Sequence, residues 1–242
     1  NAVPNLRDAW ATTAAYAERE YLIYEGERLT YAEAHDRVNA LGNWLIAQGV
    51  KSGDRVAIAM RNYPEWMLSY WATLSIGATV VGMNAWWTGP EMLYALNDSK
   101  PKVIIVDDER LTTLNDIKEQ LPQLQVIGVR LMSDHQGVTP WENVIAHPTP
   151  IAAVEIDPDS DACIFYTSGT TGNPKGAQLT HRGCVSNIWS LMFAGALQRV
   201  LAVQKGLIEA DAEPPIPSSL VTTPLFHVTA NNCVAHGTTL AG

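Results

Sequence analysis

Apolar residues are arranged along the chain in two alternating patterns. Short, continuous apolar runs are typical of strands that are buried on both faces. Such runs occupy residues 56–60, 79–82, 103–106, 124–127 and 162–166, and a shorter one occupies 177–179. Between most of them lie longer stretches in which apolar and polar residues mix as they do in helices. The pattern predicts strands that alternate with helices.

Start and stop signals define these helices. Thr30 and Glu33 form a capping box, and Gly49 is placed to end the helix that they begin. The apolar face of that helix carries Ala34, Val38, Leu41 and Leu45. Further helices are predicted from Pro64, over 91–96, over 111–121 and from His181, which Thr180 caps. A hairpin, formed by 21–24 and the residues around Leu29, precedes the first helix.

Strands joined by helices at this spacing favour a parallel sheet, because parallel strands need long crossovers. The predicted fold class is α/β: a doubly wound, mostly parallel sheet with helices on both faces. Residues 128–161 are polar and separate the first α/β block from the strand at 162–166. Residues 209–219 contain three prolines and predict an exposed, mobile excursion. Ligands of such sheets bind beyond the carboxyl ends of the strands, so the loops there should hold the chemistry.

One apolar stretch is long enough to cross a bilayer, because no charged residue occurs between Glu65 and Glu91. Serine, threonine, asparagine and glycine residues interrupt it, and Gly77 falls where an apolar helix would give way to a strand of β-branched residues. A buried helix followed by a buried strand explains the stretch better than a membrane span.

Composition narrows the function. The net charge of -9 disfavours a nucleic-acid partner, which needs clustered lysine and arginine. The three cysteines are far apart, so neither a disulfide framework nor a zinc site is indicated, and this usage fits a reducing cytoplasm. The six histidines lack zinc-site spacing, and the acidic segment 157–161 lacks the glycine and glutamate of a calcium loop. No metal-ligating residue is therefore predicted within the chain.

A segment rich in glycine and hydroxyl side chains follows the strand predicted at 162–166. It reads Thr-Ser-Gly-Thr-Thr-Gly-Asn-Pro-Lys-Gly, from Thr167 to Gly176. Glycines let backbone N–H groups converge on an anion, hydroxyls add donors, and lysine supplies positive charge. The order of residues differs from a Walker loop, because Pro174 precedes the lysine, and from the dinucleotide fingerprint. The sequence predicts a polyphosphate loop with Lys175 on the rim of a mobile turn; composition alone also fits a flexible surface turn.

This ten-residue segment resembles, position for position, the signature loop of the adenylate-forming superfamily, which includes acyl-CoA synthetases, luciferases and peptide-synthetase adenylation domains. Thr-Pro-Leu-Phe-His-Val, from Thr223 to Val228, is similar to the family's next motif. Residues 29–33 and 49–58 resemble its first conserved stretch, which serves packing. The resemblance covers nearly the whole chain and is of the acyl-CoA synthetase, or fatty-acid–CoA ligase, type, with 209–219 as an insertion.

The resemblance implies an ATP-dependent ligase in which the loop grips the β and γ phosphates while a carboxylate attacks the α phosphorus. The residues that would bind the nucleotide are Thr167, Ser168, Gly169, Thr170, Thr171, Gly172 and Lys175. The catalytic residues would be Lys175 and His227, the histidine lying beside the acyl pocket and the adenylate. ATP and coenzyme A would be co-substrates and Mg²⁺ the cofactor, and a small-molecule carboxylic acid would be the other substrate. Thr229 to Asn231 depart from the family's pattern after the histidine, so the resemblance does not imply a depth for the acyl pocket.

Later family motifs are absent from the 242 residues: the glutamate that helps to hold Mg²⁺, the ribose-binding aspartate, the hinge and the lid lysine. The resemblance therefore implies the N-terminal portion of an AMP-binding domain without its C-terminal lid. Residues of about 1–55 would begin one α/β subdomain, about 56–200 would form the main one with the loop, and about 201–242 a return segment. We expect this fragment alone not to complete the reaction. Two other functions remain open: a nucleotide-binding or scaffold module without catalysis, and a phosphotransferase that releases ADP.

Overall fold

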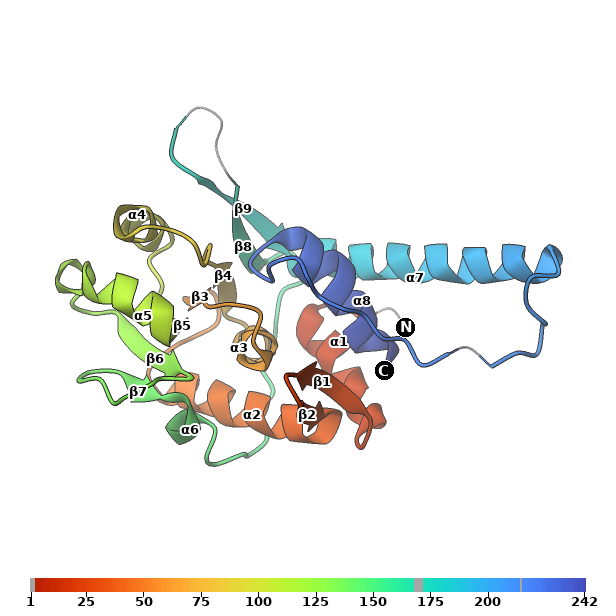
Figure 1. The fold of residues 1–242 in the computed structure, drawn as a ribbon, viewed down its shortest axis with the longest axis horizontal. Coiled ribbons are helices and arrows are strands. Elements are labelled where there is room, and N and C mark those ends of the chain that lie inside the picture. The colour runs from red at the N-terminus through yellow and green to blue at the C-terminus, as the bar shows by residue number, and fades with distance from the viewer. Residues whose placement is uncertain (1–2, 168–171, 214) are drawn as a thin grey trace.

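A seven-stranded sheet forms the centre of the computed structural model, which describes residues 3–167, 172–213 and 215–242 (Figure 1). Its strand order is β7-β6-β5-β3-β4-β8-β9, and every neighbouring pair is parallel except β8 and β9. The strands are β3 (Arg55–Ala59), β4 (Thr79–Gly82), β5 (Val103–Asp107), β6 (Gln125–Val129), β7 (Thr139–Pro140), β8 (Asp161–Thr167) and β9 (Lys175–Thr180). A separate hairpin pairs β1 (Glu20–Tyr24) with β2 (Glu27–Thr30).

Helices cover both faces of this sheet because its central strands are apolar on both sides. Val103 and Ile105 of β5 pack in the core that includes α2 (Tyr31–Ala47) and α3 (Pro64–Ser75). Ile104 and Val106 belong to the opposite core, with α4 (Gly89–Ser99) and α5 (Asp108–Asn115). Successive side chains of a strand point to opposite faces, so a continuous apolar run fills both layers. The predicted doubly wound α/β fold is confirmed.

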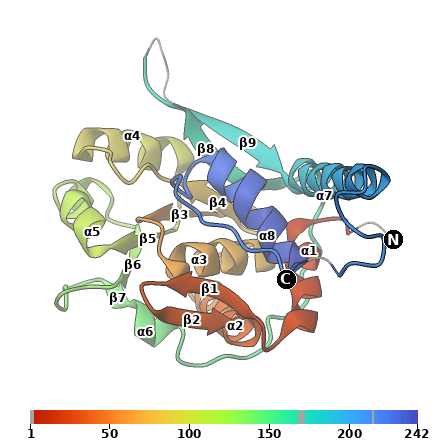
Figure 2. The same cartoon turned by 45° about the vertical axis from the view of Figure 1, so that its right-hand side comes forward.

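The remaining helices lie around this layered centre. The helices α1 (Leu6–Thr12) and α8 (His236–Ala241) contact each other and α7 (His181–Gln204). Beyond them α7 extends away from the body of the molecule (Figures 1 and 2). The short helices are α6 (Trp141–Val144), the 3₁₀ helices η1 (Thr13–Tyr16) and η2 (Lys118–Gln120), and the π-helix η3 (Thr229–Ala235).

Several sequence predictions are confirmed. The capping box of Thr30 and Glu33 begins α2, and Pro64 is the first residue of α3. The long uncharged stretch is the buried helix α3 followed by the buried strand β4. Within the described ranges no helix combines the length and apolar character that crossing a membrane requires. The excursion at 209–219 is exposed wherever it is described, and its described residues form neither helix nor strand.

Other boundaries were predicted wrongly. The helix predicted at 111–121 begins at Asp108, because the carboxylate of Asp107 accepts the backbone N–H of Arg110 and caps it, and it ends at Asn115. A second capping box, Thr88 with Glu91, starts α4 before the predicted 91–96 and extends it to Ser99. The polar stretch 128–161 is also not merely a separator. It contributes the edge strand β7 and α6, whose Trp141 and Val144 are buried.

Two buried histidines are held in their neutral form. Burial lowers the pKa of His181 to about 4 and that of His236 to about 3. The Nδ1 atom of His181 accepts the backbone N–H of Leu6 at 3.3 Å, and Nε2 of His236 lies 2.9 Å from the hydroxyl oxygen of Tyr70. In the unfolded chain both rings take up a proton below about pH 6.5. The unfolded state therefore binds more protons than the folded state between that pH and the lowered values, and stability falls as the pH falls through this window.

We expect each buried histidine to lower the free energy of unfolding by up to roughly 1.4 kcal/mol per pH unit as the pH falls from about 6 to 5. Urea denaturation at several pH values measures this slope. The double variant His181→Asn/His236→Asn should flatten it, whereas His147→Asn, at an exposed position, should leave it unchanged. An equally steep slope in the double variant would contradict the assignment.

Candidate phosphate-binding site

The parallel strands β3, β4, β5 and β8 end at the same edge of the sheet, here called the carboxyl edge. Open α/β sheets bind their ligands at this edge. Asn62 follows β3 there, Asn84 follows β4, and Thr167 ends β8. The predicted phosphate loop therefore starts at the edge where the fold favours a ligand.

The two ends of the loop are held together by the β8–β9 hairpin. Thr167 pairs with Lys175 across the strands, and its Oγ1 donates to the backbone oxygen of Lys175 at 3.4 Å. Gly176 permits this pairing, because a Cβ built there would lie only 2.8 Å from Cγ2 of Ile164. Figure 1 shows both strands rising from the body of the sheet towards the loop. Lys175 thus opens a paired strand, so its backbone is more firmly held than the predicted turn rim implied.

The side chain of Lys175 remains available for an anion. Lys175 is exposed, and no carboxylate in the described ranges lies within ion-pair distance of its ammonium group. Gly172 is exposed as well. Four of the predicted nucleotide-binding residues, Ser168, Gly169, Thr170 and Thr171, lie outside the described residues. An exposed ammonium beside a glycine-rich turn can pair with phosphate oxygens.

His227 reaches the carboxyl edge on a segment that Asn62 holds in place. The Nδ2 atom of Asn62 donates to the backbone oxygens of Val221 at 3.3 Å and Thr223 at 2.9 Å. Its Oδ1 accepts the backbone N–H of Leu225 at 2.8 Å. His227 is exposed, and its Nδ1 accepts the N–H of Thr229 at 3.2 Å. In the neutral ring this contact leaves the proton on Nε2, which can donate to a ligand.

The phosphate-loop strand and the His227 segment meet at Gly82, the last residue of β4. A Cβ at Gly82 would lie 2.8 Å from the ring of Phe165, two residues before Thr167. It would also lie 3.4 Å from the backbone oxygen of Phe226, the residue before His227. A glycine here lets both segments approach β4 closely, so the fold brings the two predicted motifs to one edge.

Sequence reasoning missed Asn62, Trp86 and Gly82 as parts of this edge. Trp86 is 64% exposed, and its ring meets that of Phe226 edge to face with centroids 5.3 Å apart. A polar residue three positions after the end of the buried strand β3 was a usable signal for Asn62, whereas the contacts of Gly82 depend on a segment some 140 residues later in the chain.

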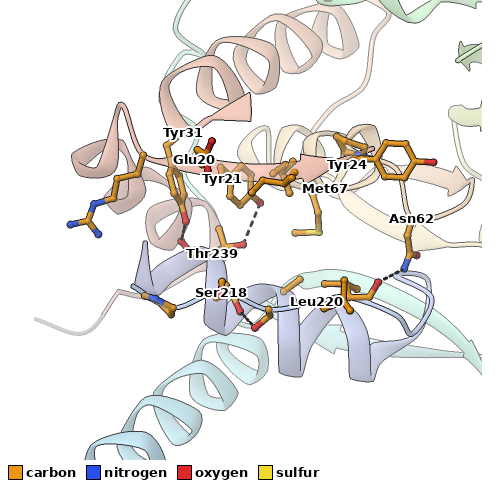
Figure 3. Close-up of a pocket in the computed structure, with 18 of the residues that line it drawn as sticks. Glu20, Tyr21, Tyr24, Tyr31, Asn62, Met67, Ser218, Leu220 and Thr239 are labelled. Carbon is orange, nitrogen blue, oxygen red and sulfur yellow. Dashed lines mark hydrogen bonds between the residues drawn. The ribbon is translucent and has the colours of Figure 1, made fainter. Parts of the chain in front are cut away.

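A separate cavity of about 810 Å³ lies beyond Asn62, between the β1–β2 hairpin and residues 216–221 (Figure 3). Tyr21 and Tyr31 line it from one side, and Leu220 and Thr239 from the other. Its lining does not include Thr167, Lys175 or His227, so this cavity is not the candidate phosphate site. Asn62 borders it while holding the segment that carries His227.

Within the described residues there is no cluster of three or more histidine, cysteine, aspartate or glutamate side chains placed to hold a metal ion. Mg²⁺ at a nucleotide site is usually held by one or two carboxylates together with the phosphates of the substrate.

We expect Asn62→Ala to lower the rate of the full-length enzyme on the order of ten- to a hundredfold, because three hydrogen bonds that fix the His227 segment are lost. The matched control is Asn43→Ala. Asn43 donates to the backbone oxygen and the hydroxyl of Thr149, on a loop remote from the carboxyl edge. The control should retain its rate. Steady-state kinetics of both variants measure these rates. An undiminished rate in Asn62→Ala would show that the His227 segment does not need the hydrogen bonds to Asn62.

Known proteins that are similar to this chain include acid–CoA ligases. A medium-chain fatty-acid–CoA ligase of Escherichia coli (strain K12) is 29% identical over 192 residues, which cover 76% of this chain and 34% of the relative. A crotonobetaine/carnitine–CoA ligase of Salmonella heidelberg (strain SL476) is 29% identical over 207 residues, covering 79% and 38%. A solved anthranilate CoA ligase in complex with anthranoyl-AMP matches with a TM-score of 0.72 at 26% identity, covering 78% and 36%. The chain thus spans little more than a third of the length of these relatives.

The family model described as AMP-binding enzyme matches residues 9–242, which include the phosphate loop and the His227 segment. This match covers nearly the whole chain, and the relatives above are acid–CoA ligases. The chain therefore belongs to the AMP-binding enzyme family, the adenylate-forming enzymes.

Proposed function

We propose that the protein containing this chain activates a carboxylic acid with ATP and then transfers the acyl group to the thiol of coenzyme A. The observation that supports the proposal is that Thr167, which begins the glycine- and hydroxyl-rich segment, ends a strand at the carboxyl edge of the sheet and pairs with the exposed Lys175, which has no ion-pair partner among the described residues. Membership of the AMP-binding family and the acid–CoA ligase relatives support it.

The first step is a nucleophilic substitution at the α phosphorus of ATP. A carboxylate oxygen of the acid forms a bond to this phosphorus, and the bond from it to the oxygen that bridges to the β phosphorus breaks. The products are acyl-adenylate and pyrophosphate. Negative charge moves onto the departing pyrophosphate, so donors preorganised around it lower the barrier. We assign this role to the loop residues Thr167, Ser168, Gly169, Thr170, Thr171 and Gly172 and to the ammonium of Lys175.

We assign His227 a position beside the reacting carboxylate and the adenylate. Its exposed ring lies at the carboxyl edge with Nε2 able to donate a hydrogen bond. Such a donor can orient a carboxylate oxygen or stabilise charge on the adenylate. In the second step the thiolate of coenzyme A attacks the acyl carbon, and AMP leaves with its phosphate oxygen.

We also propose how the chain is divided into subdomains. Residues of about 1–55 begin one α/β subdomain, about 56–200 form the main one, and about 201–242 return to the carboxyl edge. The hydrogen bonds between Asn62 and residues 221–225 support the return of this last segment to the edge.

The products of ATP consumption test the function. The full-length protein, given ATP, coenzyme A and a panel of aliphatic and aromatic acids, should release AMP and pyrophosphate only when a suitable acid is present. Release of ADP would instead identify a phosphotransferase. Binding of ATP without acid-dependent turnover across the panel would identify a nucleotide-binding module without catalysis.

A further inference from the structure

Two adjacent tryptophans follow β4 at the carboxyl edge, on a turn whose backbone is held by several hydrogen bonds. The backbone N–H of Trp87 donates to the backbone oxygen of Asn84 at 3.2 Å, and that of Trp86 donates to Oδ1 of the same asparagine at 2.9 Å. The backbone oxygen of Ala85, between them, accepts Nε of the buried Arg110 at 2.6 Å. The capping box that begins α4 follows directly. The turn therefore presents its two tryptophans from a fixed backbone.

The two indole rings pack against different segments of the chain. Trp86 meets Phe226 edge to face, with ring centroids 5.3 Å apart, and Phe226 is the residue before the predicted catalytic histidine. Trp87 meets Tyr166 in the same geometry, with centroids 5.4 Å apart, and Tyr166 directly precedes Thr167, the first residue of the phosphate loop. Edge-to-face contacts favour one relative orientation of two rings. One turn thus holds the side chain that precedes each of the two predicted motifs.

Each partner residue also contacts the framework of the sheet. The hydroxyl of Tyr166 donates to Oδ2 of Asp98 in α4 at 2.7 Å. The backbone oxygen of Phe226 lies beside Gly82 at the end of β4, where the absence of a side chain lets it approach. The two segments therefore have separate supports, and each indole ring adds to only one of them. Removal of one indole ring should loosen one motif and leave the other in place.

We propose that Trp86 and Trp87 are positioning residues for acyl-adenylate formation, a role that rests on the proposed function. Trp87 orients the strand that leads into the phosphate loop and so acts on ATP. Trp86 orients the segment that carries His227 and so acts on the carboxylic acid. Each acts through the ring against which it packs. Rate and affinity depend steeply on the placement of binding groups, so a small displacement of either motif is costly. Because both rings stand on one turn, that turn sets the two motifs relative to each other.

Binding and kinetics of the full-length protein test the two positions separately. Trp87→Ala should weaken ATP binding, measured by calorimetry, about tenfold and change KM for the acid less than about twofold. Trp86→Ala should do the reverse: KM for the acid should rise about tenfold, and ATP binding should change less than about twofold. Trp86→Phe and Trp87→Phe keep a ring in place and should recover most of each loss.

The matched control is Trp44→Ala. Trp44 is half-buried like Trp87, but it packs from α2 against the core of the sheet and belongs to no segment of the carboxyl edge. Its loss should lower the melting temperature and leave both ATP binding and KM for the acid unchanged. A purely structural role of the two tryptophans predicts the same behaviour for all three alanine variants.

A double-mutant cycle shows whether Trp86 acts through Phe226. In a Phe226→Ala background, Trp86→Ala should raise KM for the acid less than about twofold further, because the ring that it orients is already gone. Additive effects would mean that Trp86 itself contacts a substrate, and this would overturn the proposal. Equal effects of Trp86→Ala and Trp87→Ala on both ligands would overturn it as well.

Failure of the proposed function gives a different result. Absence of acid-dependent AMP release from the unaltered protein would contradict the ligase reaction. Calorimetry of ATP binding needs no turnover, so a selective loss of ATP affinity in Trp87→Ala would still support the role of Trp87. Unchanged ATP affinity in Trp87→Ala, in a protein that does release AMP with an acid, would overturn the positioning role and leave the ligase function standing.

Discussion

Lys175→Ala in the full-length enzyme should lower the rate of acyl-adenylate formation on the order of ten- to a thousandfold, because removal of one preorganised charge partner typically costs a few kcal/mol in the transition state. The ammonium group has no ion-pair partner in the described ranges, so its loss leaves no buried charge behind. The melting temperature should therefore remain close to that of the unaltered protein. Initial rates at saturating ATP and acid measure the effect.

The matched control for this change is Lys51→Ala. Lys51 is also exposed, but it lies in the turn before β3, at the opposite edge of the sheet. The control should retain its rate. An equal loss in both variants would point to a general effect of net charge, and an unchanged rate in Lys175→Ala would remove the lysine from the phosphate site.

Asp107→Ala should lower the free energy of unfolding by about 3–5 kcal/mol, because it leaves a buried guanidinium without its buried partner. The side chains of Asp107 and Arg110 are only 4% and 3% exposed, and their charged groups lie 3.3 Å apart. The carboxylate also accepts the backbone N–H groups of Arg61 and Arg110. Arg110 in turn donates to the backbone oxygen of Ala85 at 2.6 Å, which ties α5 to the loop after β4. Urea denaturation measures the loss.

Glu109→Ala is the informative control, because Glu109 also contacts Arg110. Its carboxylate lies nearer, at 2.7 Å from Nη1, but its side chain is 65% exposed. Solvent screens an exposed pair, so the loss should stay below about 1 kcal/mol. Burial of the ion pair, rather than its distance, should thus determine which variant loses more stability. A Glu109→Ala variant as unstable as Asp107→Ala would contradict this reasoning.

The layered fold was predictable because parallel strands buried on both faces leave continuous apolar runs. Strands such as 103–106 and the capping box at Thr30 follow from local sequence alone. The boundaries of α5 were not predictable in the same way, since the decisive contact is a side-chain cap by Asp107, itself the last residue of a strand. The small strand β7 depends on pairing with β6, which no local pattern in a polar stretch reveals.

In the candidate site, too, some features follow from local sequence and others depend on tertiary contacts. Local order marked Thr167 to Gly176 and His227 as motifs, because each is a continuous segment. Their meeting at the carboxyl edge depends on Gly82 and Asn62, whose roles come from contacts with residues far along the chain. Periodicity and spacing do not reveal tertiary contacts of this kind, so the sequence predicts the chemistry of the site, and the structure shows how its described residues are arranged.

Isotope exchange between labelled pyrophosphate and ATP is the measurement closest to the proposed chemistry, because it reports reversal of the adenylation step without coenzyme A. The full-length protein should return label to ATP only in the presence of a carboxylic acid substrate, and Lys175→Ala should slow this exchange far more than Lys51→Ala. Acid-independent exchange, or no exchange with an acid that the protein demonstrably converts to its coenzyme A thioester, would contradict an acyl-adenylate intermediate formed at this loop.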